Sequence, residues 1–153
     1  VHPLAAAGEI ECRGGLKVKP GYTFDKAPGL DIILVPGGPG ARQHGRQKPV
    51  LKFLRERSES PADIASVCTG SYLLAEAGLL DGLEATTHSA RLKEFAKTFP
   101  KVKAKGDKIV DQGRIITSGG VSSGIDLALY LLEKYYGKKA RSREAKRLDG
   151  PWR

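Results

Sequence analysis

The order of strands and helices along the chain predicts an α/β fold with a mostly parallel sheet that is covered on both faces. Two short apolar runs, 31–35 and 64–67, are each bounded by turn residues, which is typical of strands buried in a parallel sheet. A helical pattern follows each run, and the glycine-rich loop 118–124 opens another helix. The length of 153 residues fits one core, so we expect a single domain over 1–153.

The elements of the first half follow from turn residues and from the spacing of apolar side chains. Residues 9–18 predict two short strands around a double-glycine turn. Residues 20–30 are rich in proline and glycine and predict a loop before the strand at 31–35. In 48–58, apolar residues recur on one helical face, which predicts a helix between the two buried strands.

The second half begins with a predicted helix over 70–80 that ends at Gly82. Residues 85–87 predict a short β-type segment. Residues 91–98 predict a helix that stops before a proline. Residues 108–117 predict a hairpin about a Gln-Gly turn, after which the glycine-rich loop leads into the last helix.

The last predicted helix spans about 125–136 and ends at Gly137, and the segment after it is strongly basic. The formal net charge of the chain is +9, and a basic tail can bind nucleic acid. No aromatic side chains interleave these charges as a stacking platform requires. We expect the solvated end of an amphipathic helix and no nucleic-acid partner. The basic residues are Lys134, Lys138, Lys139, Arg141, Arg143, Lys146, Arg147 and Arg153.

Composition excludes several classes of protein. Hydrophobic residues make up 40% and charged residues 28%, which is typical of globular domains, and no apolar run approaches the ~18 residues of a membrane span. Two cysteines do not make a disulfide framework, and without a signal-peptide pattern we expect a cytoplasmic location and no membrane contact. His2, His44, His88 and the cysteines show no zinc-ligand spacing, so we expect no metal and no cofactor.

Chemically interesting residues follow three predicted strands at the point where each strand ends. Gly37 and Gly38 follow the first strand, Cys68 the second, and the loop 118–120 a later one. In α/β sheets, sites lie at the carboxyl ends of the strands. The sequence therefore predicts one site that is shared by these three segments.

Cys68 is the candidate nucleophile of this site. It lies between a buried strand and a helix that starts at Gly70, so it must make a tight turn, and Gly70 helps that turn close. The turn lifts the sulfur out of the sheet, as the nucleophile elbow of hydrolases does for serine. A helix N-terminus supplies a positive field and free N–H groups, which favour the reactive thiolate form. The alternative is a small apolar filler.

Two other features can serve a nucleophile at this edge. Gly37 and Gly38 can present backbone N–H groups to a developing oxyanion, and their absent side chains leave room for a substrate; the alternative is a plain loop. His88 follows the segment 85–87 and can accept a proton from the thiol or orient it. The alternative is a surface histidine near a helix start.

Taken together, four motifs resemble the ThiJ/PfpI superfamily. Their order and spacing match over roughly residues 16–150. The forms Cys-Thr-Gly and Thr-Thr-His resemble the isonitrile hydratase branch and the amidotransferase-like sensor domain of some transcription regulators. The motifs are Asp-Ile-Ile-Leu-Val-Pro-Gly-Gly at 31–38, Ala-Ser-Val-Cys-Thr-Gly at 65–70, Ala-Thr-Thr-His at 85–88 and Thr-Ser-Gly-Gly-Val-Ser-Ser-Gly-Ile-Asp at 117–126.

The resemblance implies a flavodoxin-like three-layer sandwich with Cys68 as the reactive residue at the elbow. It implies that the N–H groups of Gly38 and Thr69 form an anion hole, that Thr69 takes part in the site and that His88 lies near the thiol. It also implies a small-molecule substrate and a homodimer. The glycines expected to contact the substrate are Gly37, Gly119 and Gly120.

One departure from the family's pattern bears on the chemistry. The family begins with a strand and a helix that carry an acidic residue in contact with the cysteine, and this sequence starts after that unit. We therefore expect either that the domain is incomplete at its N-terminus or that another chain fills the gap. Glu9 and Glu11 do not match the missing acid, and Asp126 is a dipole partner of its helix rather than a catalyst.

Three functions remain open from the sequence. The first is an enzyme in which Cys68 adds to an electrophilic carbon, such as that of an isonitrile, and water completes a hydration or hydrolysis. The second is a non-catalytic redox or ligand sensor whose Cys68 oxidises reversibly. The third, nucleic-acid binding through the basic tail, is the least favoured.

Overall fold

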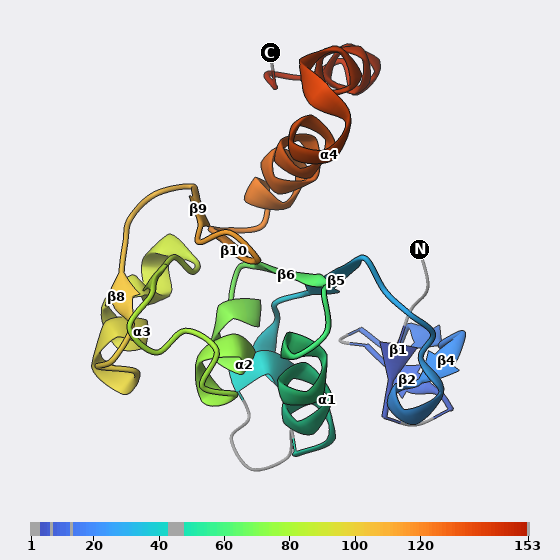
Figure 1. Ribbon diagram of the computed structural model, residues 1–153, viewed down its shortest axis with the longest axis vertical. Coiled ribbons are helices and arrows are strands. Elements are labelled where there is room, and N and C mark those ends of the chain that lie inside the picture. Colours follow the sequence, from blue (N-terminus) through green and yellow to red (C-terminus); the bar gives the residue numbers. More distant parts are fainter. Residues whose placement is uncertain (1–3, 7, 13, 43–47, 153) are drawn as a thin grey trace.

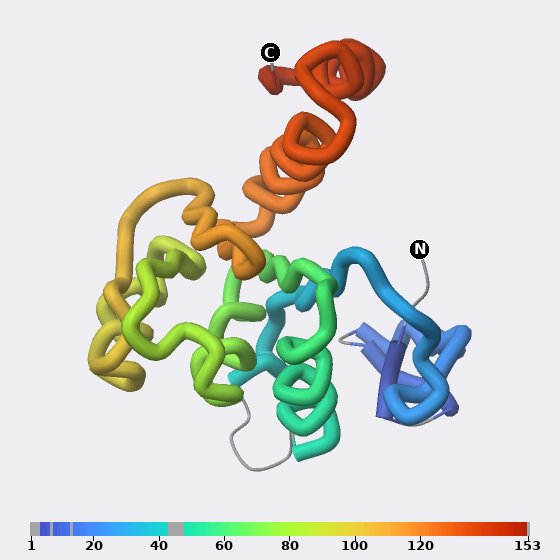
Figure 2. The backbone as a smooth tube through the Cα atoms, in the orientation of Figure 1, coloured from blue at the N-terminus to red at the C-terminus, as the bar shows by residue number. Residues whose placement is uncertain are grey.

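The computed structural model describes residues 4–6, 8–12, 14–42 and 48–152 and has the predicted α/β architecture. Figure 1 shows helices α1 and α2 on one side of a central sheet and the long helix α4 on the other, and Figure 2 shows the same path along the backbone. His2, His44 and Arg153 lie outside the described residues, so the expectations for them are not addressed by the structure.

The central sheet has the strand order β5-β6-β10-β9. Strands β5, β6 and β10 are mutually parallel, and β9 runs antiparallel to β10. The three parallel strands therefore bring their carboxyl ends to one edge of the sheet, as the sequence predicts. The strands are β5 (Ile32–Val35), β6 (Asp63–Val67), β9 (Ile109–Asp111) and β10 (Ile115–Ser118).

Two hydrophobic cores lie on opposite faces of this sheet. Ile64 belongs to the larger core, together with Leu54 of α1, whereas the next residue, Ala65, packs with Leu127 of α4 in the smaller one. Successive side chains of a strand point to opposite faces, so β6 serves both cores. The result is three layers. The helices are α1 (Lys48–Ser58), α2 (Gly70–Glu76), α3 (Leu92–Thr98) and α4 (Ser123–Arg147).

The N-terminal residues form two small paired units beside the sheet. The predicted hairpin is present, since β2 (Ile10–Glu11) pairs antiparallel with β3 (Lys17–Val18). Strand β1 (Leu4–Ala5) pairs parallel with β4 (Tyr22–Thr23). The prediction of a plain loop over 20–30 is wrong at β4 and at the 3-10 turn η1 (Phe24–Lys26). Phe24 stacks on Phe53 of α1 at 4.8 Å, and this tertiary contact holds a segment whose composition favours a loop.

A second small pair carries the chain from the sheet to α3. Strand β7 (Glu84–Ala85) pairs parallel with β8 (Lys103–Ala104), so only Ala85 of the predicted segment 85–87 is in a strand. The 3-10 turn η3 (Ser89–Arg91) leads directly into α3. Phe95 of α3 is fully buried and packs against Tyr72 of α2, with ring centroids 5.1 Å apart.

Glycines determine where two helices end, but only one of these two ends lies at the residue that the sequence predicts. Helix α2 stops at Glu76 rather than near residue 80, because Gly78 adopts a left-handed conformation (φ +82°) before Gly82 does. In α4, Gly137 (φ +81°, ψ 170°) ends the first helical segment as predicted, but a second segment continues to Arg147. Figure 1 shows this second segment turned at an angle to the first.

Strand β5 is less buried than its continuous apolar sequence predicts. Ile33 and Val35 are 6% and 5% exposed and face the larger core, whereas Leu34 is 57% exposed. Helix α4, which covers that face, packs on β6, β9 and β10. The prediction that this strand is buried on both faces is therefore wrong for Leu34 in the described chain.

Helix α4 is anchored to the sheet by a polar cluster at the end opposite to Cys68. Tyr130 donates to Asp111 Oδ2 at 2.6 Å, Lys134 Nζ lies 3.2 Å from the same oxygen, and Tyr135 donates to Asp63. The hydrogen bond to Asp111 raises the pKa of Tyr130 to about 12. Within the described ranges, no helix combines the length and the apolar character needed to cross a bilayer.

Candidate functional site

The three predicted strand ends meet in the structure. The Cys68 N–H, which follows β6, donates to the carbonyl oxygens of Ser118 and Gly119, which follow β10, at 3.0 and 2.8 Å. The Gly38 N–H, which follows β5, donates to Thr69 Oγ1 at 2.9 Å. The segments that the sequence assigns to one site are therefore tied together by hydrogen bonds.

Cys68 itself makes the sharp turn between β6 and α2. Its φ is +58°, a conformation that L-residues with a Cβ avoid, and only Asp149 shares it among the described non-glycine residues. The residue is half-buried and its thiol is free. Strain of this kind persists where the surroundings over-determine it, and it is concentrated at functional sites. The local geometry thus has the features of the elbow that the strand–Cys–Thr–Gly pattern predicts.

Two glycines let the β5 loop and the Cys68 turn touch. A Cβ on Gly37 would lie 2.9 Å from Cys68 Cβ and 2.8 Å from the Thr69 nitrogen. A Cβ on Gly70 would overlap the carbonyl oxygen of Val35. The prediction that the missing side chain of Gly37 leaves room for a substrate needs correction, because the Cys68 turn takes up that space.

Thr69 and Gly38 are joined by two hydrogen bonds. The Gly38 N–H donates to Thr69 Oγ1, and the same hydroxyl donates to the Gly38 carbonyl oxygen at 3.1 Å. For this reason Thr69, although it precedes α2, makes no side-chain cap on that helix. The amide that we expected to face an oxyanion is therefore occupied by a neighbouring hydroxyl in this state.

His88 lies against the glycine-rich loop. A Cβ on Gly120 would be 3.4 Å from the nearest ring carbon of His88 and 3.5 Å from Nε2. The Ala90 N–H donates to His88 Nδ1 at 3.2 Å, so in the neutral ring the proton is on Nε2. This arrangement makes the neutral His88 a hydrogen-bond donor at Nε2, which fits a role in orienting a neighbouring group better than a role in accepting a proton at that nitrogen.

The turn that carries His88 is held from α2. Tyr72 is 1% exposed, and its hydroxyl donates to the carbonyl oxygen of Arg91 at 3.4 Å. Burial raises the pKa of Tyr72, so the hydroxyl keeps its proton. The Arg91 N–H in turn donates to the His88 carbonyl oxygen at 2.7 Å. His88 is therefore fixed to the same core that supports the Cys68 turn.

Two hydroxyl groups at Cys68 are not predicted from the sequence. Ser71 Oγ and Thr87 Oγ1 both donate to the Cys68 carbonyl oxygen, at 3.2 and 3.1 Å. Both residues are buried, with 0% and 2% exposure. The only signal available was position, since Ser71 lies three residues after Cys68 and Thr87 directly before His88.

Glu9 forms an ion pair with Lys17 at 3.6 Å within the N-terminal hairpin. Among the residues that the structure describes, no three His, Cys, Asp or Glu side chains are grouped so that they could hold a metal ion.

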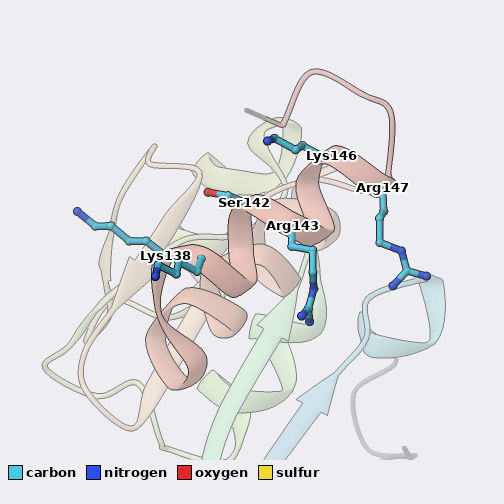
Figure 3. A pocket seen from close by; sticks show the side chains of 6 residues that line it. Lys138, Ser142, Arg143, Lys146 and Arg147 are labelled. Carbon is cyan, nitrogen blue, oxygen red and sulfur yellow. The ribbon is translucent and has the colours of Figure 1, made fainter.

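A separate hollow of about 570 Å³ lies on the second segment of α4, away from Cys68. Figure 3 shows basic side chains projecting around it. Glu144 pairs with two of them, Arg143 at 2.9 Å and Arg147 at 3.2 Å. The residues that line the hollow are Lys138, Lys139, Ser142, Arg143, Lys146 and Arg147.

The chain is similar in sequence to known proteins. The chain is 41% identical over 123 residues to an isonitrile hydratase of Pseudomonas putida, an alignment that covers 80% of this chain and 53% of that protein. It is 32% identical over 141 residues to the HTH-type transcriptional regulator GbdR of Pseudomonas aeruginosa, covering 90% of this chain and 38% of the regulator. The chain thus spans about half of the first relative's length and less of the second's.

A solved structure of similar fold also comes from the ThiJ/PfpI family. A ThiJ/PfpI family protein from Pseudomonas syringae superposes with a TM-score of 0.76 at 30% identity, covering 86% of this chain and 55% of that one. The model of the DJ-1/PfpI family matches residues 3–134, which include Cys68 and every other residue assigned to the site above. The chain belongs to the DJ-1/PfpI family.

Proposed function

We propose that this chain carries the nucleophile of an enzyme that hydrates a small isonitrile. The observation that carries the proposal is a half-buried free thiol at Cys68, held at φ +58° on a strand–helix turn. The 41% identity to an isonitrile hydratase supports the choice of substrate class. Thiols are strong nucleophiles, and the terminal carbon of an isonitrile is a small electrophile that such a site can admit.

The reaction requires no oxidant or reductant. The Cys68 sulfur forms a bond to the isonitrile carbon, which also gains the thiol proton, to give a thioimidate. Water then adds across the C=N bond, with its oxygen on the carbon and its proton on the nitrogen. The C–S bond breaks as the C=O bond forms, and the sulfur regains a proton. The product is an N-substituted formamide.

Three residues have roles in this scheme. Thr69 exchanges its contacts with Gly38 for contacts with the reacting atoms, and the Gly38 and Thr69 N–H groups stabilise the developing negative charge. His88 donates from Nε2 to the same charge. The two hydrogen bonds between Thr69 and Gly38 support this assignment, because they align both groups beside Cys68 before a substrate arrives.

The glycine-rich loop is proposed to contact the substrate. Gly119 and Gly120 lie between Cys68 and His88: the Gly119 carbonyl accepts from the Cys68 N–H, and Gly120 faces the His88 ring. Gly37 lines the same turn, although its own space is filled. The homodimer and the cytoplasmic location remain predictions.

A second function is a redox sensor in which peroxide oxidises Cys68 to a sulfenic acid and is itself reduced to water. The free, half-buried thiol of Cys68 favours it. The chain is also 25% identical to protein dj-1beta of Drosophila melanogaster, over 91% of this chain and 75% of that protein. The HTH-type regulators among the relatives fit a sensing role as well.

Formamide production from an alkyl isonitrile tests the first function. We expect turnover by the full chain and its loss in Cys68→Ala, while Cys12→Ala, which alters the exposed cysteine, retains it. No turnover in the unmodified chain, with reversible sulfenic acid at Cys68 in dilute peroxide, would support the sensor and exclude the hydratase.

A further inference from the structure

The strained backbone of Cys68 is held by hydrogen bonds on both of its peptide groups. On the N–H side, the carbonyl oxygens of Ser118 and Gly119 accept. On the carbonyl side, the hydroxyls of Ser71 and Thr87 donate. A left-handed residue that is not glycine relaxes to a right-handed or extended conformation unless its surroundings prevent it. Every backbone polar group of Cys68 is thus engaged in keeping the turn.

We propose that Thr87 and Ser71 are positioning residues, whose two hydroxyls clamp the Cys68 carbonyl and so keep the sulfur at its reactive place. The proposal rests on the proposed function, because it assigns a task to the same site. It differs from a role in the chemical steps, since both hydroxyls donate to a backbone carbonyl oxygen.

The two halves of the clamp come from different parts of the chain. Ser71 lies in the first turn of α2, three residues after Cys68, so its contact is local. Thr87 is nineteen residues away and directly precedes His88. Its hydroxyl therefore stabilises the conformation of the Cys68 turn. The same hydrogen bond fixes the distance between that turn and the segment that carries His88.

Simple satisfaction of a buried carbonyl is the alternative. The fold contains another buried threonine whose hydroxyl serves a backbone group, in this case an N–H: Thr117 Oγ1 accepts from the Thr86 N–H at 2.9 Å, and Thr117 is 1% exposed. Loss of its hydroxyl should destabilise the fold without acting on the Cys68 carbonyl. Thr117→Val is therefore the matched control for a purely structural effect, and Thr98→Val, which affects an exposed hydroxyl bonded to Glu94, is the neutral control.

The experiment compares Thr87→Val, Thr87→Ser and Ser71→Ala with these controls in the full chain. Alkylation by iodoacetamide is followed at Cys68 and at the exposed Cys12 in the same sample, so that the ratio of the two rates reports the local environment of Cys68. Turnover of an alkyl isonitrile and thermal unfolding are measured in parallel.

We expect Thr87→Val to lower the Cys68-to-Cys12 rate ratio about tenfold, which is less than the roughly 100-fold that a 1 Å misplacement of a reacting group can cause. Thr87→Ser, which keeps the hydroxyl, should restore the ratio, and kcat should follow it with KM little changed. Ser71→Ala should also lower the rate ratio. If Thr87→Val does not fold, the rate ratio of Ser71→Ala tests the clamp.

Three results would overturn the clamp: an unchanged ratio in the hydroxyl-free variants, a loss in Thr87→Ser as large as in Thr87→Val, or an equal loss in Thr117→Val. The labelling ratio needs no substrate. If the unmodified chain turns over no isonitrile, the proposed function fails, while the ratio still decides whether the clamp is real.

Discussion

Thr69 holds Gly38 at both of its backbone polar groups: its hydroxyl accepts from the Gly38 N–H at 2.9 Å and donates to the Gly38 carbonyl oxygen at 3.1 Å. This pair closes the loop after β5 onto the turn after β6. Because the same N–H is the proposed donor to an oxyanion, Thr69 controls both the orientation of that donor and its availability. The hydroxyl now accepts the hydrogen bond that the proposed oxyanion would need from this N–H.

Substitution of Thr69 tests this relationship. Thr69→Val should lower the free energy of unfolding by about 1–2 kcal/mol, because it removes two part-buried hydrogen bonds. It should also lower kcat/KM for an isonitrile roughly 100-fold, since the Gly38 amide is no longer aligned. Thr69→Ser should retain both properties. Urea unfolding and formamide production give the two quantities, and full activity in Thr69→Val would contradict the assignment.

The left-handed conformation of Cys68 predicts an unusual order of stability among its variants. Glycine adopts φ +58° freely, whereas alanine retains the strain of the Cβ, so Cys68→Gly should be more stable than Cys68→Ala by about 1 kcal/mol. At Cys12, which does not have a positive φ, alanine should be at least as stable as glycine. The midpoints of urea unfolding provide the comparison, and equal effects at the two sites would argue against a strained turn.

Contact between the β5 loop and the Cys68 turn should make two glycines intolerant of a methyl group. Gly70→Ala and Gly37→Ala place Cβ atoms less than 3.0 Å from backbone atoms, so each should cost about 1–3 kcal/mol or more in stability. Gly40→Ala has open space and ordinary backbone angles, and it is the control. Thermal unfolding of the three variants decides whether this contact exists, because without it all three would behave alike.

Much of this arrangement can be predicted from local sequence. Short apolar runs cut off by Pro-Gly-Gly or Cys-Thr-Gly mark strands that end in tight turns, and parallel pairing then brings the turns to one edge. The position of Cys68 and its neighbours Gly38 and Gly119 follows from these two rules. That is why the convergence of the three loops, which needs no knowledge of side-chain packing, was predictable.

Other features depend on contacts that the sequence does not encode locally. Serine and threonine are common, so nothing marks Ser71 and Thr87 as partners of the Cys68 carbonyl until the chain is folded. The contact of Gly37 with Cys68, instead of with a substrate, is likewise a matter of packing between loops. The tautomer of His88 depends on one amide, that of Ala90, whose position is set by the turn η3.

The anchor between α4 and the sheet should make stability depend on pH at both extremes. Burial opposes the charge of Asp111, but hydrogen bonds from Tyr130, the Gly113 N–H and Lys134 outweigh it and lower the pKa of this carboxyl. A carboxyl with a lowered pKa stabilises the fold at higher pH, and its contribution is lost as the pH falls through its folded-state pKa. Asp111→Asn should therefore reduce the stability at neutral pH and flatten the loss in acid.

Tyr130 responds in the opposite direction. Its pKa rises from 10.0 to about 12, so its contribution is complete below pH 10 and disappears as the pH approaches 12. The difference in stability between the unmodified chain and Tyr130→Phe should be constant below pH 10 and shrink above it. Urea titrations at several pH values measure this difference, and Tyr136→Phe, at a tyrosine that is 75% exposed, is the comparison. A difference that grows above pH 10 would contradict the hydrogen bond to Asp111.

The basic second segment of α4 should not make the chain a nucleic-acid-binding protein. Glu144 partly neutralises Arg143 and Arg147 at the hollow, and non-specific binding through phosphates alone is weak at physiological salt. We expect a dissociation constant for a duplex of arbitrary sequence above about 100 μM near 0.15 M salt, measured by fluorescence anisotropy. Micromolar binding with a steep dependence on salt, abolished in Lys138→Gln/Lys146→Gln but not in Lys17→Gln/Lys52→Gln, would show instead that this surface binds the phosphate backbone.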